Sequence, residues 1–288
     1  MTILVMGATG NVGKVVLAGL VEKGIKVRGM TRYSAKLDTF PAGAEGCVGD
    51  LVAMGSLGKP LAGVEQVFLT TPLSQNEIQA GRNAITAAKM AGVKKIVYMS
   101  EPQPPGSEKI PHFRNKSLIE KALKESDITY TILRPNNYFQ NDLWGQAAIM
   151  AYGTYPQPLG NNGLNRVDSR DVADAAINAL LNDGFENEEF AINGPDVLTG
   201  DSIAAMFAEQ LGREIRYAGD DLEAWAKQSQ HMMPAWMVED FKVMYAYFQE
   251  QGLKATQEDL DKQHAIVGHA PRNFSDFVAE LVREWTAK

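Results

Sequence analysis

The amino-acid sequence predicts an α/β protein with a doubly wound parallel sheet and a smaller, mostly helical C-terminal domain. From Thr2 to about Gly194, short β-rich runs alternate with longer stretches of helical spacing, which is typical of a parallel sheet covered by helices. The runs at residues 96–99 and 128–133 are apolar on both faces or nearly so, as expected for strands buried beneath two helical layers. After Gly194 the strand signals mostly end and helical spacing dominates.

Seven β-rich runs predict the strands of this sheet, at residues 3–6, 26–30, 46–48, 66–70, 95–100, 129–133 and 189–192. The stretches between them predict five covering helices, at residues 11–23, 54–61, 76–91, 113–126 and 169–181. Four more helices are predicted in the C-terminal part, at residues 199–211, 221–229, 234–251 and 274–285. Such a sheet binds its ligands at the carboxyl ends of its strands, so functional residues are expected just after each strand.

The composition is that of an ordinary globular protein, and it excludes several functions. The chain has 288 residues, is 45% hydrophobic and carries a net charge of -7, so no broad phosphate-binding surface for nucleic acid is expected. A single cysteine, Cys47, excludes an intrachain disulfide and a cysteine-rich zinc site. The first residues suggest a strand rather than a signal peptide, and no apolar run approaches a membrane span. We therefore expect a cytoplasmic protein without a membrane partner.

A glycine-rich turn, GATGNVG at residues 7–13, directly follows the first strand and opens the first helix. Glycine at these positions permits the tight turn and the close approach of a pyrophosphate, while the helix N-terminus offers free N–H groups to the phosphates. The turn therefore predicts a Rossmann-type dinucleotide site. Its expected cofactor-binding residues are Gly7, Thr9, Gly10, Asn11, Val12 and Gly13.

The segment after the second strand predicts NADP rather than NAD. An acidic residue about 20 positions after the turn would bind the ribose 2′-hydroxyl of NAD, but the charged residues between Gly24 and Asp38 are all basic. Arg32, with Lys36 nearby, is placed where it can bind a 2′-phosphate. The alternative is that both residues belong to a solvated basic edge.

The ends of the third and fourth strands predict further cofactor contacts. Asp50 and Leu51 follow the third strand, and the Asp50 carboxylate is expected to accept a hydrogen bond from the adenine amine or, alternatively, to cap the following helix. Thr70, Thr71 and Pro72 close the fourth strand. Their backbone is expected beside the nicotinamide half of the cofactor, with a plain strand-ending turn as the alternative.

Other motifs exclude some activities and point to an apolar pocket. His231, His264 and His269 lack metal-ligand spacing, so no metal site is predicted. Neither a Gly-x-Ser-x-Gly elbow nor a Walker phosphate loop is present, which argues against a hydrolase or a nucleotidase. Residues 231–248 concentrate methionines and aromatic residues, which suit an adaptable apolar pocket or else belong simply to helix core.

Five segments together resemble the NmrA-like group of atypical short-chain dehydrogenase/reductases. They are the turn at residues 7–13, TRYSAK at 31–36, PHFRNK at 111–116, RPNNYFQN at 134–141 and VDSRDVA at 167–173. The resemblance implies an NADP-binding Rossmann domain, expected to comprise residues 1–134 and about 165–194. A smaller substrate-binding domain is then expected from about residues 135–164 and 195–288.

The sequence departs from ordinary short-chain dehydrogenases, which use a Tyr-x-x-x-Lys pair, because His112 stands at the tyrosine position. Ser100 ends the fifth strand and Lys116 follows His112 by four residues, so these three side chains are expected to converge at one pocket. The resemblance also places Lys116 beside the nicotinamide, whereas an exposed ion pair with Glu120 is the alternative. His112 is expected to relay a proton, or else to bind backbone at a helix start.

The segment after the sixth strand is expected where the nicotinamide meets the substrate. In the family that this chain resembles, the segment touches the carboxamide and the ribose, which makes Asn136 and Tyr138 expected cofactor contacts. The phenol of Tyr138 is also a catalytic candidate, because it is able to stack or to donate a proton. The alternative is that it only fills space.

These features predict an NADPH-dependent oxidoreductase that transfers a hydride to a planar aromatic, quinone-like or enone acceptor. Lys116, with His112 or Tyr138, is expected to neutralise the charge that develops on the acceptor oxygen. Two alternatives remain open: a non-catalytic NADP(H)-binding redox sensor, favoured by the missing tyrosine, and a cofactor-assisted oxygenase or isomerase acting on an aromatic polyketide-like substrate. The sequence also leaves a homodimer open.

Overall fold

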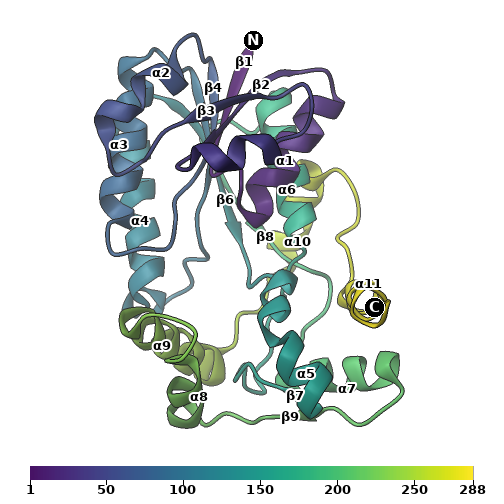
Figure 1. The fold of residues 1–288 in the computed structure, drawn as a ribbon. Helices are drawn as coiled ribbons and strands as arrows, with labels where there is room; N and C mark the ends of the chain where they lie inside the picture. The colour runs from purple at the N-terminus through teal and green to yellow at the C-terminus, as the bar shows by residue number, and fades with distance from the viewer. Residues whose placement is uncertain (288) are drawn as a thin grey trace.

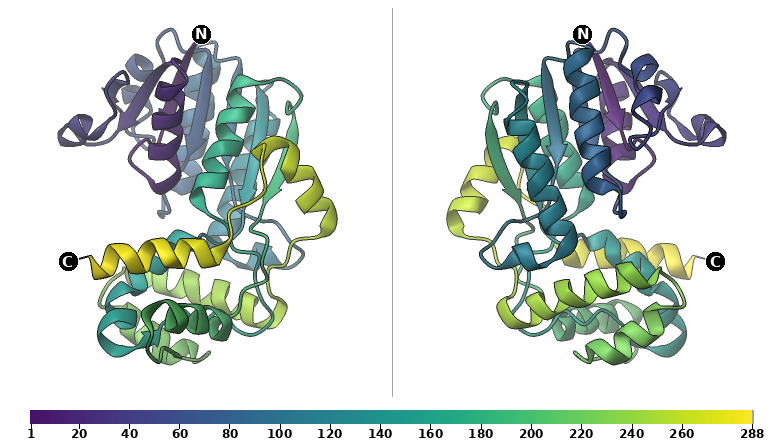
Figure 2. Two further views of the ribbon diagram at one scale, coloured as in Figure 1. Left: turned by 90° about the vertical axis from the view of Figure 1, so that its right-hand side faces the viewer. Right: turned by 90° about the vertical axis from the view of Figure 1, so that its left-hand side faces the viewer.

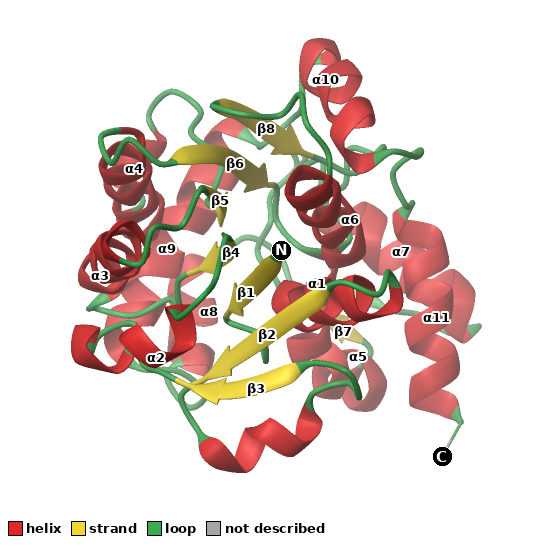
Figure 3. Ribbon diagram, turned by 90° about the horizontal axis from the view of Figure 1, so that it is seen from above, coloured by secondary structure: helices red, strands yellow, loops and turns green. Residues whose placement is uncertain are grey.

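The computed structural model describes residues 1–287, which build a seven-stranded sheet with helices on both faces (Figure 1). All neighbouring strands of the sheet are parallel. Their order is β3-β2-β1-β4-β5-β6-β8, as Figure 3 shows from above. The strands are β1 (Thr2–Met6), β2 (Lys26–Thr31), β3 (Glu45–Val48), β4 (Gln66–Thr70), β5 (Lys95–Met99), β6 (Thr129–Pro135) and β8 (Glu188–Ile192).

The strand order reverses at β1, which lies between β2 and β4. The chain first runs outward through β2 and β3 and then returns to the other side of β1 to form β4. At such a reversal, the loops that leave the two neighbouring strands run in opposite directions and leave a crevice at the carboxyl edge. The glycine turn after β1 and the loop after β4 therefore lie side by side.

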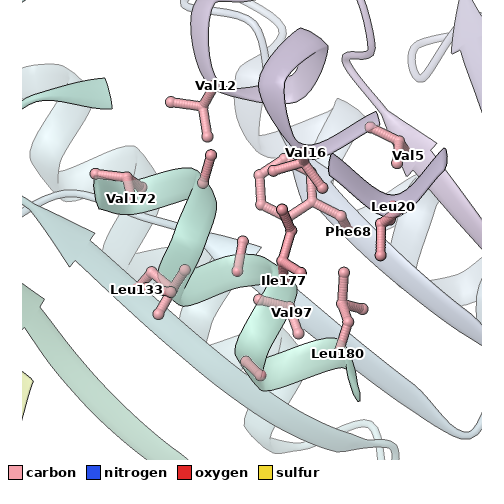
Figure 4. Close-up of a cluster of buried hydrophobic side chains, with 14 of the residues drawn as sticks. Val5, Val12, Val16, Leu20, Phe68, Val97, Leu133, Val172, Ile177 and Leu180 are labelled. Atoms are coloured by element: carbon pink, nitrogen blue, oxygen red, sulfur yellow. The ribbon is translucent and has the colours of Figure 1, made fainter. Parts of the chain in front are cut away.

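Helices cover both faces of the sheet, as a doubly wound fold requires. One face is covered by α1 (Asn11–Glu22) and α6 (Ser169–Leu181), and the other by α2 (Gly58–Leu61), α3 (Glu77–Met90) and α4 (Pro111–Lys124). Figure 4 shows the apolar cluster beneath α1 and α6, in which Phe68 and Val97 of the central strands meet Val16 and Ile177 of the two helices. The second face has an apolar cluster of its own. The predicted fold class is confirmed.

A mostly helical part lies beyond the carboxyl edge of the sheet (Figures 1 and 2). Its helices are α5 (Gln146–Tyr152), α7 (Gly200–Leu211), α8 (Leu222–Ser229), α9 (Ala235–Gln251) and α11 (Phe274–Thr286), and a short parallel pair joins β7 (Thr154–Tyr155) to β9 (Arg216–Tyr217). It has its own apolar cluster, built around buried Phe139, Phe207 and Phe274. Because α9 contacts α4, this helical part covers the ends of the strands.

Helix α10 (Gln257–Val267) returns to the sheet from the helical part. It packs on α6 and β8, where Ile266 and Val267 join the cluster beneath α6. This helix is not predicted from the sequence, because QEDLDKQHAIV carries few apolar residues and shows no clear period. The loop at residues 268–273 then leads back to α11, and Arg272 in this loop pairs with Asp171 and Asp174 of α6.

The seven predicted strands are confirmed to within two residues at each end. The predicted helix at residues 54–61 is wrong as a single helix, since the chain forms a 3-10 turn, η2 (Met54–Ser56), before the one-turn α2; Gly55 and Gly58 weaken a continuous helix here. The helix predicted from residue 113 begins at Pro111, whose fixed φ suits a first helical position. Three more 3-10 turns are η1 (Ser34–Thr39), η3 (Ser107–Lys109) and η4 (Phe139–Gly145).

Among the described residues, no helix is both long and apolar enough to cross a membrane.

Candidate cofactor site and active site

A cavity of about 290 Å³ lies against the glycine turn at the point where the strand order reverses. We call it the turn cavity. Its walls come from the ends of β1, β2, β3 and β4 and the loops that follow them, and are formed by Gly7, Thr9, Gly10, Met30, Thr31, Arg32, Gly49, Asp50, Leu51, Thr70, Thr71 and Pro72. Most of the cofactor-binding residues predicted from the sequence are in this set.

The glycine turn fits a bound pyrophosphate. Gly7 has a φ of 85°, and a Cβ on it would lie 2.2 Å from Thr70 Cγ2, while a Cβ on Gly13 would lie 2.2 Å from the Gly7 carbonyl oxygen. Gly10 caps α1 without any side chain, so no side-chain oxygen competes with an anion there. The first backbone N–H groups of a helix have no intrahelical partner, and here they are those of Asn11, Val12 and Gly13.

Two basic side chains flank an exposed tyrosine next to the turn cavity. The Arg32 guanidinium lies 5.4 Å and the Lys36 ammonium 5.8 Å from the centre of the Tyr33 ring. Arg32 lines the cavity and Lys36 does not. Since neither residue forms a salt bridge within residues 1–287, both cations are free to bind a phosphate. One Asp50 oxygen accepts the Val52 N–H at 3.0 Å, which leaves the other oxygen for a ligand.

A second cavity, also of about 290 Å³, lies between the strand ends and the helical part. We call it the aromatic cavity. Its sheet side includes Thr71, Glu101 and Tyr138, and α4 contributes His112, Phe113 and Lys116. The helical part supplies mostly apolar side chains, namely Trp144, Trp225, Met232, Met233, Phe241, Met244, Tyr245 and Phe248. Thr71 lines both cavities, so the two sites meet at this residue.

Lys116 is buried on α4 with its ammonium directed at the strand ends. Its Nζ donates to Thr71 Oγ1 at 2.9 Å and to the Met99 carbonyl at 3.4 Å, and it pairs with Glu77 Oε1 at 3.2 Å. Thr71 in turn donates to the same Glu77 carboxylate at 3.0 Å. The alternative pairing of Lys116 with Glu120 is wrong, because the side chain of Lys116 reaches across to the start of α3 instead.

His112 lines the aromatic cavity at the start of α4. Its Nδ1 forms a hydrogen bond with Oδ1 of Asp240 on α9, and the two side chains are only 8% and 6% exposed. Two aromatic rings meet the imidazole nearly edge to face, Phe113 with centroids 4.8 Å apart and Phe241 with centroids 5.8 Å apart. The imidazole is therefore fixed by contacts from both the sheet side and the helical part.

Glu101 and Tyr138 add polar groups to the same wall. Burial raises the pKa of Glu101, although His112 and Lys116 lower it in part. Burial and the nearby Glu101 carboxyl raise the pKa of Tyr138 well above its usual value. The phenol therefore stays protonated, and its hydroxyl lies 3.3 Å from Met99 Sδ.

Asn136 also lines the aromatic cavity, but its amide is already engaged. The Nδ2 group donates to Asn193 Oδ1 at 3.0 Å and to the Leu253 carbonyl at 2.9 Å, while Oδ1 accepts the Asn137 N–H at 2.8 Å. These bonds shape the backbone after β6. The side chain of Asn136 therefore positions its neighbours rather than offering a free hydrogen bond to a ligand.

A fully buried arginine supports the segment that carries Tyr138. Arg166 donates from Nη2 to the Tyr138 carbonyl at 2.6 Å and from Nε to Asn137 Oδ1 at 2.9 Å, and it pairs with Asp142 at 3.0 Å. The Asp142 carboxylate also accepts hydrogen bonds from Tyr155 and Gln157. This network holds Asn137, Tyr138 and Gln157, which line the aromatic cavity.

Ser100 does not join His112 and Lys116, contrary to the expected convergence. Its hydroxyl donates to Glu120 Oε1 at 2.5 Å, and Arg134 binds the same carboxylate at 2.6 Å. Ser100 is completely buried and lines neither cavity. The side chain points toward α4 rather than toward the cavity, so we do not include it in the proposed site.

Four residues of the site were not predicted: Glu77, Glu101, Arg166 and Asp240. All four are charged. Glu77, Arg166 and Asp240 are buried in the fold, and Glu101 lines the aromatic cavity among apolar side chains. Asp240 stands next to Glu239 among the methionines and aromatic residues of α9, and nothing in the sequence distinguishes it from that exposed neighbour or pairs it with His112. Glu77 follows the β4 loop closely, but nothing in the sequence pairs it with Lys116.

Comparisons with known proteins agree with this fold. The model of the NmrA-like family matches residues 1–278. An NAD(P)H azoreductase of Xenophilus azovorans is 31% identical over 278 residues, which cover 96% of each chain. The crystal structure of an NADPH-dependent quinone oxidoreductase of Escherichia coli complexed with NADPH is similar with a TM-score of 0.87 and 25% identity, covering 97% of this chain and 99% of that one. The triphenylmethane reductase of Citrobacter sp. gives a TM-score of 0.85 and 25% identity, covering 98% of this chain and 100% of that one. This chain belongs to the NmrA-like family.

Proposed function

We propose that this protein is an NADPH-dependent reductase that transfers a hydride to a planar aromatic, quinone-like or enone acceptor. The observation that carries the proposal is the meeting of two different cavities at Thr71. One contains a glycine turn that fits a dinucleotide, and the other is walled by aromatic and methionine side chains. The named relatives, an azoreductase, a quinone oxidoreductase and a triphenylmethane reductase, support this class of acceptor.

The turn cavity holds the adenine and pyrophosphate half of NADPH in this proposal. The N–H groups at the start of α1 bind the pyrophosphate, and Arg32 with Lys36 binds the 2′-phosphate that distinguishes NADPH from NADH. Asp50 contacts the adenine through its free carboxylate oxygen. Thr70, Thr71 and Pro72 then lead toward the aromatic cavity, where Asn136 and Tyr138 border the nicotinamide.

The aromatic cavity holds the acceptor and supplies the polar groups that reduction needs. Bound NADPH supplies the hydride. The Lys116 ammonium, held in place by Glu77 and Thr71, stabilises negative charge that develops on the acceptor. His112 donates a proton to the reduced acceptor, while Tyr138 lines the wall and stays neutral.

A small-molecule acceptor is sufficient as a partner in this scheme. A homodimer and a cytoplasmic location remain predictions from the sequence, as does the division into two domains. The redox-sensor alternative predicts that NADPH binds without being consumed. Measuring NADPH consumption therefore distinguishes the reductase from the sensor.

The test is consumption of NADPH, followed by absorbance with purified protein and a panel of quinones, azo dyes, enones and aromatic ketones. Binding of NADPH is first confirmed by fluorescence. We expect protein-dependent oxidation with at least one class of acceptor and a clear preference for NADPH over NADH. Tight binding without oxidation across the panel would contradict the reductase and favour the sensor.

A further inference from the structure

The pair formed by His112 and Asp240 joins the two parts of the molecule across the aromatic cavity. His112 belongs to α4, which covers the sheet, whereas Asp240 belongs to α9 of the helical part. Asp240 stands behind the imidazole and is not itself part of the cavity wall. We propose that Asp240 is the positioning residue that orients His112 as the proton donor to the bound acceptor. This inference rests on the proposed reductase function.

The hydrogen bond determines which nitrogen of His112 is available. Because Nδ1 is engaged by Asp240, only Nε2 is left for an acceptor in the cavity that the ring lines. A carboxylate bound to Nδ1 fixes the tautomer of the imidazole and stabilises the imidazolium. The Nε2–H of that imidazolium is then the group that faces an acceptor oxygen or nitrogen.

The surroundings of the pair hold the ring in one orientation. Phe241, the residue after Asp240, packs against the imidazole from α9 and also lines the cavity. Phe113 packs against the imidazole from α4. Besides His112, the charged residues that line this cavity are Glu77, Glu101 and Lys116. Lys116 is committed to Glu77 and Thr71, so the proton and the fixed positive charge come from different side chains.

The proton balance of the reaction separates two kinds of acceptor. A neutral quinone or azo compound takes up a hydride and one proton, so a C–H or N–H bond forms from the hydride, and an O–H or N–H bond forms from the proton of His112 Nε2. The neutral imidazole then regains a proton from water. A cationic acceptor, such as a triphenylmethane dye cation or N-methylacridinium, becomes neutral on taking up the hydride and needs no proton.

The experiment compares Asp240→Asn with the wild-type protein on these two kinds of acceptor. We expect kcat with a quinone to fall by about 10²-fold, the range of general acid catalysis, with an unchanged KM for NADPH. The rate with the cationic acceptor should stay within about threefold. Glu239→Gln, an exposed neighbour on the same helix, is the matched control and should leave both rates unchanged.

A measurement without turnover completes the test. The chain has four histidines, so ¹H–¹⁵N spectra of the imidazoles are simple, and His112→Gln assigns the signal of His112. We expect a downfield Nδ1–H resonance in the NADPH-bound wild-type protein and its loss in Asp240→Asn. An equal loss of rate with both acceptors, an unchanged quinone rate or a persisting resonance would overturn the proposal.

If the wild-type protein reduces no acceptor at all, the proposed function fails. The resonance of His112 then still decides whether Asp240 orients the ring, because it is recorded without turnover. If only the neutral acceptor reacts, the comparison with the cationic acceptor is lost. In that case a lower kcat with an unchanged KM for NADPH in Asp240→Asn, together with loss of the Nδ1–H resonance, supports the proposal. The two failures are therefore distinguishable.

Discussion

Lys116 and Glu77 form a buried ion pair between two helices of the same face, with 3.2 Å between Nζ and Oε1. Glu77 is completely buried and Lys116 is 4% exposed. The second Glu77 oxygen has no hydrogen-bond partner within the described residues. The carboxylate therefore depends on Lys116 and Thr71, and the lysine has a structural role besides the catalytic one that we propose.

Removal of Lys116 should consequently destabilise the folded protein and also lower the rate of NADPH oxidation. Lys116→Met leaves a buried carboxylate without its cation, which should lower the free energy of unfolding by about 3 to 5 kcal/mol. The double variant Lys116→Met/Glu77→Gln should recover most of that stability but none of the turnover. Urea unfolding and NADPH oxidation measure the two effects separately. Lys121→Met, on the exposed side of the same helix, is the control, and a single variant as stable as the wild type would refute the dependence.

Arg32 should determine the preference for NADPH. Arg32→Ala removes the guanidinium that lines the turn cavity, so the dissociation constant for NADPH should rise by about tenfold, or about 1.4 kcal/mol. The constant for NADH should hardly change, because NADH lacks the 2′-phosphate. Fluorescence titration with both cofactors checks this, with Lys26→Ala at the opposite end of β2 as the control. Parallel losses for both cofactors would show that Arg32 does not read the phosphate.

Gly13→Ala should damage the glycine turn directly. A Cβ at this position would lie 2.2 Å from the Gly7 carbonyl oxygen, so α1 would have to move away from the turn and carry its N–H groups with it. We expect a loss of NADPH affinity of about tenfold or more and a lower melting temperature. Gly58→Ala is the matched control, because its Cβ would meet no atom within 4 Å. If Gly13→Ala binds NADPH normally, the tight packing is not needed for the site.

Glu101 should make stability depend on pH. Burial raises the folded-state pKa of Glu101 above the unfolded value, so the folded protein holds this proton more tightly. Stability contributed by the protonated form is therefore lost as the pH rises through the folded pKa. Glu101→Gln should be more stable than the wild type at about pH 8 and equal to it below the unfolded pKa of about 4.3. Urea unfolding at both pH values checks this, and Glu125→Gln, exposed at the C-cap of α4, should show no such difference.

The sequence was sufficient for the centre of the sheet because β1, β4 and β5 are buried on both faces and carry apolar runs. The glycine turn was predictable for a similar reason, since only glycine tolerates the contacts that Gly7 and Gly13 make. The pairing of side chains was not predictable. Ser100 and Lys116 each turn toward an acid on a neighbouring element, Glu120 and Glu77, and such choices depend on packing between segments far apart in the chain. Asp240 likewise reaches His112 across 128 positions of sequence.

The path of the chain has a consequence for how this protein can be altered. The helical part is assembled from separate stretches, and α10 returns to the sheet before α11 completes the helical cluster. The helical part therefore cannot be removed or exchanged as one continuous segment. Replacing it with that of a relative would require several chain junctions to match at once. If the aromatic cavity holds the acceptor as we propose, new acceptor preferences should come from substitutions in α8, α9 and the turn between them, where Met232 and Met233 border this cavity. The dinucleotide half is then left untouched, and one cofactor can serve many acceptors.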